Sequence, residues 1–172
     1  MSGAGTEFGW MAVRDGDMRA LALADRHYSR QKPGTPLFIG PGHKLALVTT
    51  DGLAVWGVRL AMFRADGRAG DWECVIFRNE GPYLSSHLIV LALAHTRWLW
   101  GEPPTGGMFT FIGHGLRGGC FHAAGFHRDG QAADGRLCLR LAPERFPPAM
   151  RPAEWCEQIP LPLHELAGGG PQ

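Results

Sequence analysis

The stretch from Trp72 to Trp100 constrains the fold most strongly, because it joins a buried strand pattern to a buried helix pattern. WECVIF (72–77) is a short apolar run rich in β-branched and aromatic residues, which is typical of a strand. LSSHLIVLALAHTRWLW (84–100) is the longest helical candidate, and the GEPPTGG that follows it ends the helix. A strand that feeds a helix in this way predicts a layered domain with helices packed on a sheet.

The rest of the chain alternates between strand and helix patterns. We expect further strands at 8–15, 43–50, 53–64 and 108–113, and in a last hairpin formed by FHRDG and GRLCLRL. Asp51-Gly52 marks the hairpin between the second and third strands. We expect helices at 17–30, opened by Asp15 or Asp17 and ended before Pro33, and at 118–126, closed by Gly125.

The resulting order, β-α-β-β-β-α-β-α-β-β, predicts an α+β (or α/β layered) fold with a mixed, mostly antiparallel central sheet flanked by helices. We expect one domain over residues 8–142, followed by an irregular tail at 143–172 that is rich in proline and glycine. A chain of 172 residues is long enough for one domain with a real core and too short for two comfortable ones.

Composition excludes some classes of protein and leaves others open. The chain is 45% hydrophobic and 19% charged, which is typical of a globular protein. Its net charge of +1 neither requires nor excludes a nucleic-acid partner. The four cysteines form no Cys-x-x-Cys pair and no signal peptide is evident, so we expect free thiols and a cytoplasmic protein. Metal-ligand spacing is absent, and no apolar run is long enough to span a membrane.

The turn between the strand at 72–77 and the helix at 84–100 has two interpretations. A helix N-terminus exposes unpaired backbone N–H groups and a positive dipole end, which together attract phosphate. Gly81 would let the backbone approach an anion closely, and Ser85 or Ser86 would cap the helix or donate a hydroxyl to that anion. The alternative is an ordinary well-capped turn, since turns favour Gly, Pro and Asn.

Three side chains are candidates for proton transfer, and each also has a structural interpretation. His27 is a candidate base near neutral pH, and Tyr28 a candidate donor to a leaving thiolate. Alternatively, Tyr28 packs in the core and His27 interacts with the C-terminal dipole of its helix. Glu80 would have a raised pKa at an apolar junction and act as a base, or it would only form a surface ion pair with Arg78.

The pattern resembles the GNAT acyltransferase superfamily, in which the fourth strand and the following helix hold the pyrophosphate of acetyl-CoA. Members carry an Arg/Gln-x-x-Gly-x-Gly/Ala loop there, and Arg78-x-x-Gly81-x-Tyr83 matches its first two positions only. HYSR (27–30), RNEGPYLSSHLI (78–89) and TFIG…GGCFHAAGFHRDG (110–130) are similar to the Mom-type phage DNA-modification branch and to uncharacterised phage and prophage proteins. That branch has an acidic residue after the fifth strand, where this chain has Gly113 and His114.

The resemblance implies an acyltransferase that modifies a nucleobase or a modified nucleotide in DNA, within the host cell of a phage or prophage. Its cofactor would be acetyl-CoA or another acyl-CoA. The implied residues fall into three groups: catalytic His27, Tyr28 and Glu80; cofactor-binding Phe77, Arg78, Asn79, Gly81, Ser85 and Ser86; and acceptor-side Ser29, Arg30 and His114, with His114 as the replacement for the acidic residue.

A non-catalytic nucleic-acid-binding or accessory protein is the alternative. Such a protein would use the same fold, with the loop at 78–86 as a phosphate contact. The degenerate glycine pattern of the loop favours this alternative, whereas the grouping of His27, Tyr28 and Glu80 favours an enzyme.

Overall fold

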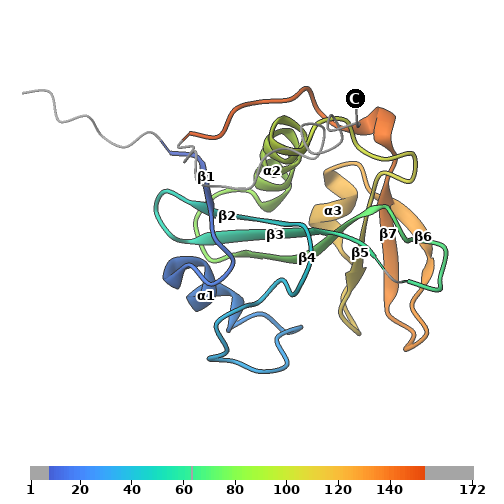
Figure 1. Cartoon of the computed structure of the whole chain (residues 1–172), viewed down its shortest axis with the longest axis horizontal. Helices are drawn as coiled ribbons and strands as arrows, with labels where there is room; N and C mark the ends of the chain where they lie inside the picture. The colour runs from blue at the N-terminus through green and yellow to red at the C-terminus, as the bar shows by residue number, and fades with distance from the viewer. Residues whose placement is uncertain (1–7, 63, 154–172) are drawn as a thin grey trace, which may run out of the picture.

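The sheet has seven strands, and helices cover both of its faces (Figure 1). The computed structural model describes residues 8–62 and 64–153. The elements are β1 (Trp10–Val13), α1 (Met18–Ala24), β2 (Lys44–Thr49), β3 (Ala54–Leu60), β4 (Trp72–Asn79), α2 (Ser85–Trp100), β5 (Met108–Ile112), α3 (Gly119–Ala123), β6 (His127–Gln131), β7 (Leu137–Leu141) and a 3₁₀ turn (Pro143–Arg145). The predicted α+β class is confirmed.

The strand order across the sheet is β1-β2-β3-β4-β5-β7-β6. Neighbouring strands are antiparallel except for β4 and β5, which are parallel. The mostly antiparallel character predicted for the sheet is therefore also confirmed. A parallel pair needs a long crossover connection, and α2 supplies it between β4 and β5.

The core lies mainly between the sheet and α2. Leu88, Ile89, Leu93 and Leu99 of α2 are buried in one cluster with the tryptophans of β1, β3 and β4. The indole N–H of Trp56 is satisfied within this layer by donating to Thr96 Oγ1 at 3.2 Å. On the opposite face a smaller cluster packs α1 against β1 to β4. Because only residues 80–84 separate β4 from α2, the N-terminus of α2 lies at the end of β4.

Strands β4 and β5 diverge. They pair only over Trp72–Cys74 and Met108–Thr110, so the second half of β4 has no partner strand on that side. A bulge falls at the point of divergence, because Gly57 of β3 opposes Ile76 while Val58 opposes Cys74, which leaves Val75 as the extra residue. The sheet therefore opens between β4 and β5 at its centre, and Figure 1 shows α3 on one face there and the chain after α1 on the other.

Two helices are shorter than the sequence predicted. α1 ends at Ala24 because the next residues form i→i−3 bonds: the amide of Arg26 donates to the Leu23 carbonyl and that of His27 to Ala24. The Asp25 carboxylate then accepts from Arg30 Nε at 2.8 Å and the Gly34 amide at 3.0 Å, which fixes a loop instead of another turn of helix. α3 ends at Ala123, and Gly125, at φ +104°, is the predicted left-handed residue that closes it.

The part of the predicted tail that the structure describes runs along α2 and β1. The amide of Met150 donates to the Ala94 carbonyl at 3.1 Å, and the amide of Ala153 donates to the Trp10 carbonyl at 3.1 Å. Residues 154–172 of that tail, including Cys156, lie outside the described residues. Within residues 8–62 and 64–153, no helix has the length and apolar character that crossing a membrane requires.

Candidate functional site

Three adjoining cavities follow the opening between β4 and β5. The first, here the gap cavity, has a volume of about 340 Å³ and is lined by Val75–Phe77 of β4 and Thr110–Ile112 of β5, with 116–121 on one side and His27 and Tyr28 on the other. The second, the loop cavity, has a volume of about 580 Å³ and lies beneath the loop that follows α1. Both are lined by Tyr28, Val75, Ile76 and Phe111, so they meet at these residues.

The third cavity lies at the N-terminus of α2 and is here the helix cavity. It has a volume of about 540 Å³ and is lined by residues 82–86 together with Gly119, Cys120 and Ala123. Gly119 and Cys120 also line the gap cavity, so these two cavities adjoin. The gap cavity therefore adjoins the helix cavity on one side and the loop cavity on the other.

Asn79 fixes the turn that forms the helix cavity. Its side-chain oxygen accepts from the Gly81 amide at 2.9 Å, and its nitrogen donates to the Tyr83 carbonyl at 2.7 Å and to Ser85 Oγ at 3.1 Å. A methyl group on Gly81 would lie 3.2 Å from Leu53 Cβ, so the turn packs closely against the hairpin at 49–54. Asn79 and Gly81 therefore shape this turn, and Ser85 accepts a bond from it.

The expected capping of α2 by Ser85 or Ser86 is wrong. Leu84 is the N-cap of α2 and makes no side-chain capping bond, while Ser85 and Ser86 are already within the helix. In the described part of the chain, the amides of Ser85, Ser86 and His87 donate to no protein acceptor. The start of this 16-residue helix therefore presents free N–H groups and its positive dipole end to the helix cavity.

The expected rise in the pKa of Glu80 is also wrong. Its carboxylate accepts from Arg26 through two bonds of 2.9 Å and from Arg78 Nε. The bonds from Arg26, followed by those from Arg78, lower the pKa of Glu80 to about 2. Arg78 also donates to the Arg26 carbonyl at 2.8 Å. Glu80 is therefore a weak base that joins the end of β4 to the turn after α1, and the predicted Arg78–Glu80 pair is present.

His27 is buried and hydrogen-bonded on its Nδ1 atom. The Ser29 amide donates to Nδ1 at 3.2 Å, and Ser29 Oγ lies 2.7 Å from the same atom, so the neutral ring carries its proton on Nε2. Burial, reinforced by the charge of Arg78, lowers the pKa of His27 to about 4, although a hydrogen bond to the Phe77 backbone opposes this shift. His27 thus stays neutral near pH 7 and holds Ser29 and the end of β4 in place.

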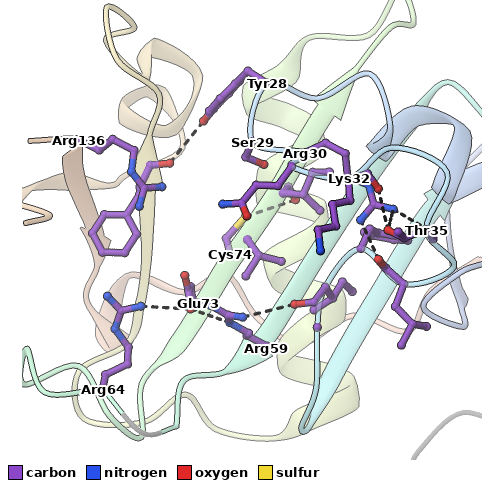
Figure 2. Close-up of a pocket in the computed structure, with 18 residues that line it drawn as sticks. Tyr28, Ser29, Arg30, Lys32, Thr35, Arg59, Arg64, Glu73, Cys74 and Arg136 are labelled. Carbon is purple, nitrogen blue, oxygen red and sulfur yellow. Dashed lines mark hydrogen bonds and ion pairs between the residues drawn. The ribbon is translucent and has the colours of Figure 1, made fainter. Parts of the chain in front are cut away.

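Tyr28 stands where the gap cavity and the loop cavity meet (Figure 2). Its hydroxyl accepts from the Gly113 amide at 3.1 Å and lies 3.4 Å from the Phe111 carbonyl, which is long for an O–H···O bond. Burial raises the pKa of Tyr28. A methyl group on Gly113 would lie 2.6 Å from the ring, so the glycine after β5 makes room for this tyrosine. The hydroxyl thus makes one normal hydrogen bond, as an acceptor, and only a long contact as a donor.

Of the two remaining acceptor-side predictions, Arg30 lines the loop cavity and His114 does not. Arg30 is committed to its own loop, because it donates to Asp25 and to the carbonyls of Leu37 and Thr35. His114 is exposed and lies near the β6–β7 turn, where a methyl group on Gly135 would be 3.9 Å from its ring. His114 lines none of the three cavities, so this position does not support its predicted role as the replacement for an acidic residue.

The charged residues of the loop cavity other than Arg30 were not predicted from the sequence. Glu73 is buried on β4 and accepts from Arg59 Nε at 2.8 Å, with Arg64 at 3.8 Å. Lys32 and Arg136 also line this cavity. A carboxylate within the apolar run WECVIF was the one available signal, because a charge in a buried strand must be paired.

The described residues hold no group of three or more His, Cys, Asp or Glu side chains able to bind a metal ion. Cys74, Cys120 and Cys138 have free thiols, and Cys120 is the one of these three that lines the gap and helix cavities. Compared with known protein families, curated proteins and solved structures, the chain has no match.

Proposed function

We propose that the protein is an acyltransferase that binds acyl-CoA along the helix and gap cavities and transfers the acyl group to an acceptor in the loop cavity. The divergence of β4 and β5 carries this proposal, because the gap cavity and the loop cavity adjoin where the two strands separate. Transfer between two substrates requires such an arrangement, in which each ligand enters from its own side and the reacting atoms meet.

The helix cavity suits the diphosphate of CoA. The unpaired amides at the start of α2 and its dipole favour an anion there. Arg117 lines the adjoining gap cavity, which adds positive charge on the same path. The resemblance to the GNAT superfamily supports the same assignment, since it implies that the fourth strand and the next helix hold this group.

The gap cavity suits the pantetheine arm. That arm is narrow and contains two amide groups, so it can pair with a strand edge as an added strand does. Between Val75 and Asn79, β4 has an edge that β5 leaves unpaired. Phe77 and Phe121, whose rings meet edge to face at 6.0 Å, supply an apolar wall for the methylene groups.

The reaction needs a proton donor for the leaving thiolate. An acceptor amine would attack the thioester carbonyl, so that a C–N bond forms and the C–S bond breaks. The amine loses one proton, which replaces on the donor the proton that is given to the thiolate. Tyr28 is our candidate donor to the thiolate, because it lines both the gap cavity and the loop cavity and its hydroxyl makes only a long contact as a donor. We assign His27 and Glu80 supporting roles, because His27 stays neutral near pH 7 with its Nδ1 engaged and Glu80 is paired with two arginines.

Gly119 offers a direct test, because it lines both proposed cofactor cavities and a side chain there has open space. In calorimetric titrations with acetyl-CoA, Gly119→Glu should weaken binding about tenfold or more, since its carboxylate would oppose the diphosphate. Gly119→Gln should weaken binding less, and Gly119→Ala should bind like the unsubstituted protein. Absence of acetyl-CoA binding, or equal affinity in all four proteins, would refute the proposal.

The charge of the loop cavity favours a second candidate, a nucleic-acid-binding accessory protein without catalytic activity. This candidate predicts that the protein binds nucleotides and does not bind acetyl-CoA. The same titrations therefore separate the two functions.

A further inference from the structure

The loop cavity concentrates positive charge that the chain as a whole lacks. Its lining contains five basic side chains and a single carboxylate, Glu73, whereas the net charge of the whole chain is only +1. The basic residues are Arg30, Lys32, Arg59, Arg64 and Arg136. An excess of one sign inside a cavity selects ligands of the opposite charge.

Two of these five cations are available to a ligand. Arg30 is held by its own loop, and Arg59 and Arg64 share Glu73. Lys32 makes no side-chain bond within the described residues, and Figure 2 shows it extending into the cavity from the loop after α1. Arg136 lies on the opposite side.

Arg136 is only weakly engaged by the protein. Its ion pair with Asp134, at 2.8 Å, is half exposed, and such pairs contribute little. Its guanidinium lies over the ring of Phe111 at 5.0 Å, which orients it beside the cavity without using its hydrogen-bond donors. Arg136 beside Phe111 and Lys32 on the loop after α1 thus offer positive charge on two sides of the cavity.

The inner end of the cavity is apolar. Val75, Ile76 and Phe111 line it where it meets the gap cavity. A ligand with an anionic group and a flat apolar body would place its anionic group among the basic residues and its apolar body toward Tyr28 and the gap cavity. Nucleotides have both an anionic group and a flat body, whereas small carboxylates lack the flat body.

We propose that the loop cavity binds a phosphate-bearing acceptor of about one nucleotide in size. This inference rests on the proposed function in so far as it names the acceptor of the acyl group. The volume of about 580 Å³ suits one small ligand and not a double helix. A nucleotide within duplex DNA would have to be flipped out to enter. A free nucleotide and one nucleotide of a single strand share the required chemistry.

The test measures binding of three probes by calorimetry without acetyl-CoA: deoxyadenosine 5′-monophosphate, deoxyadenosine, and a short single-stranded oligodeoxynucleotide. We expect the monophosphate to bind at least about tenfold more tightly than the nucleoside, because only the phosphate is attracted by the basic residues of the lining. A tighter oligodeoxynucleotide would identify a DNA strand as the source, and equal affinity would identify the free nucleotide. Failure of both phosphate-bearing probes to bind at low salt would overturn the proposal.

Substitutions then locate the binding site. Lys32→Gln and Arg136→Gln should each weaken the monophosphate about tenfold, and each should reduce the salt dependence of binding by about one charge. Arg128→Gln is the matched control, because Arg128 is exposed on the outer strand β6 and lines none of the three cavities. Loss of affinity that is equal in the control and the two test variants would refute the site.

The result of these nucleotide titrations can be distinguished from the result of the acetyl-CoA titrations that test the proposed function. Gly119→Glu should leave monophosphate binding unchanged, because Gly119 lines only the other two cavities. If the protein binds the monophosphate through Lys32 and Arg136 but does not bind acetyl-CoA, the phosphate site stands and acyl transfer is wrong. If it binds acetyl-CoA but neither phosphate-bearing probe, the acyltransferase proposal stands and the present inference is wrong.

Discussion

Replacing Tyr28 with phenylalanine separates its proposed chemical role from its structural role. The substitution removes only the hydroxyl and keeps the ring, which packs over Gly113 and lies 4.1 Å from the His27 ring between centroids. One normal hydrogen bond is lost, the 3.1 Å bond from the Gly113 amide, since the 3.4 Å contact with the Phe111 carbonyl is too long to contribute much. The expected loss of stability is therefore about 1 kcal/mol.

The expected effect of Tyr28→Phe on activity is much larger. Proton-transfer groups typically contribute about 10²–10⁴ in rate, so modification should fall by this factor. Stability would be measured by urea unfolding, cofactor binding by calorimetry, and activity by mass spectrometry of nucleosides from cells that express the protein. The affinity for acetyl-CoA should change little, because the start of α2 is untouched.

Thr96→Val is the matched control for this experiment. It also removes one buried hydroxyl, which accepts from Trp56 Nε1, and it lies in the core away from the three cavities. It should lower stability by about as much as Tyr28→Phe or more, and it should leave activity intact. If Tyr28→Phe keeps full activity, or unfolds the protein, Tyr28 is not the proton donor.

Three further predictions concern other residues of the site. Because the folded-state pKa of His27, about 4, lies below its ordinary value of 6.5, stability should fall as the pH drops from about 6.5 to 4, by at most about 3 kcal/mol from this residue. His27→Gln should make urea unfolding less pH-dependent in this window, and an unchanged dependence would contradict the burial of a neutral ring. Asn79→Ala should destabilise the fold by about 1–3 kcal/mol and weaken acetyl-CoA binding, because the three side-chain hydrogen bonds of Asn79 shape the turn before α2. An unaltered affinity for acetyl-CoA in calorimetry would show that the turn does not hold the cofactor. Acetyl-CoA should slow the alkylation of Cys120, measured by peptide mass spectrometry. Cys74 and Cys138 should react slowly with or without acetyl-CoA, because both are buried. If saturating acetyl-CoA does not change the alkylation rate of Cys120, the gap cavity is not the acetyl-CoA site.

Local sequence patterns predicted the secondary-structure elements well. All the predicted strands and helices are present in the described residues, because periodicity and glycine-rich turns report directly on local conformation. The end of α1 was misplaced by about six residues, since it depends on the contacts of Asp25 with Arg30 and Gly34, which a helical pattern does not show.

The site was harder to predict than the fold. Sequence reasoning found the turn after β4 and the residues His27 and Tyr28, which do line the gap cavity. It missed the pairing of Glu80 with Arg26, because these residues are 54 positions apart and meet only through the fold. It also missed Lys32 and Arg136, since single surface cations carry no local signal until the sheet places them around one cavity.

The most direct test of the account is the amide NMR spectrum of the ¹⁵N-labelled protein during titration with acetyl-CoA. Binding along the helix and gap cavities should shift the resonances of Ser85–His87, Val75–Phe77 and Gly119–Cys120, and should leave those of β6 unchanged. The same shifts should be absent or strongly reduced in Gly119→Glu. No shifts at saturating acetyl-CoA, or shifts only outside these segments, would contradict the proposal that the divergence of β4 and β5 is an acyl-CoA site.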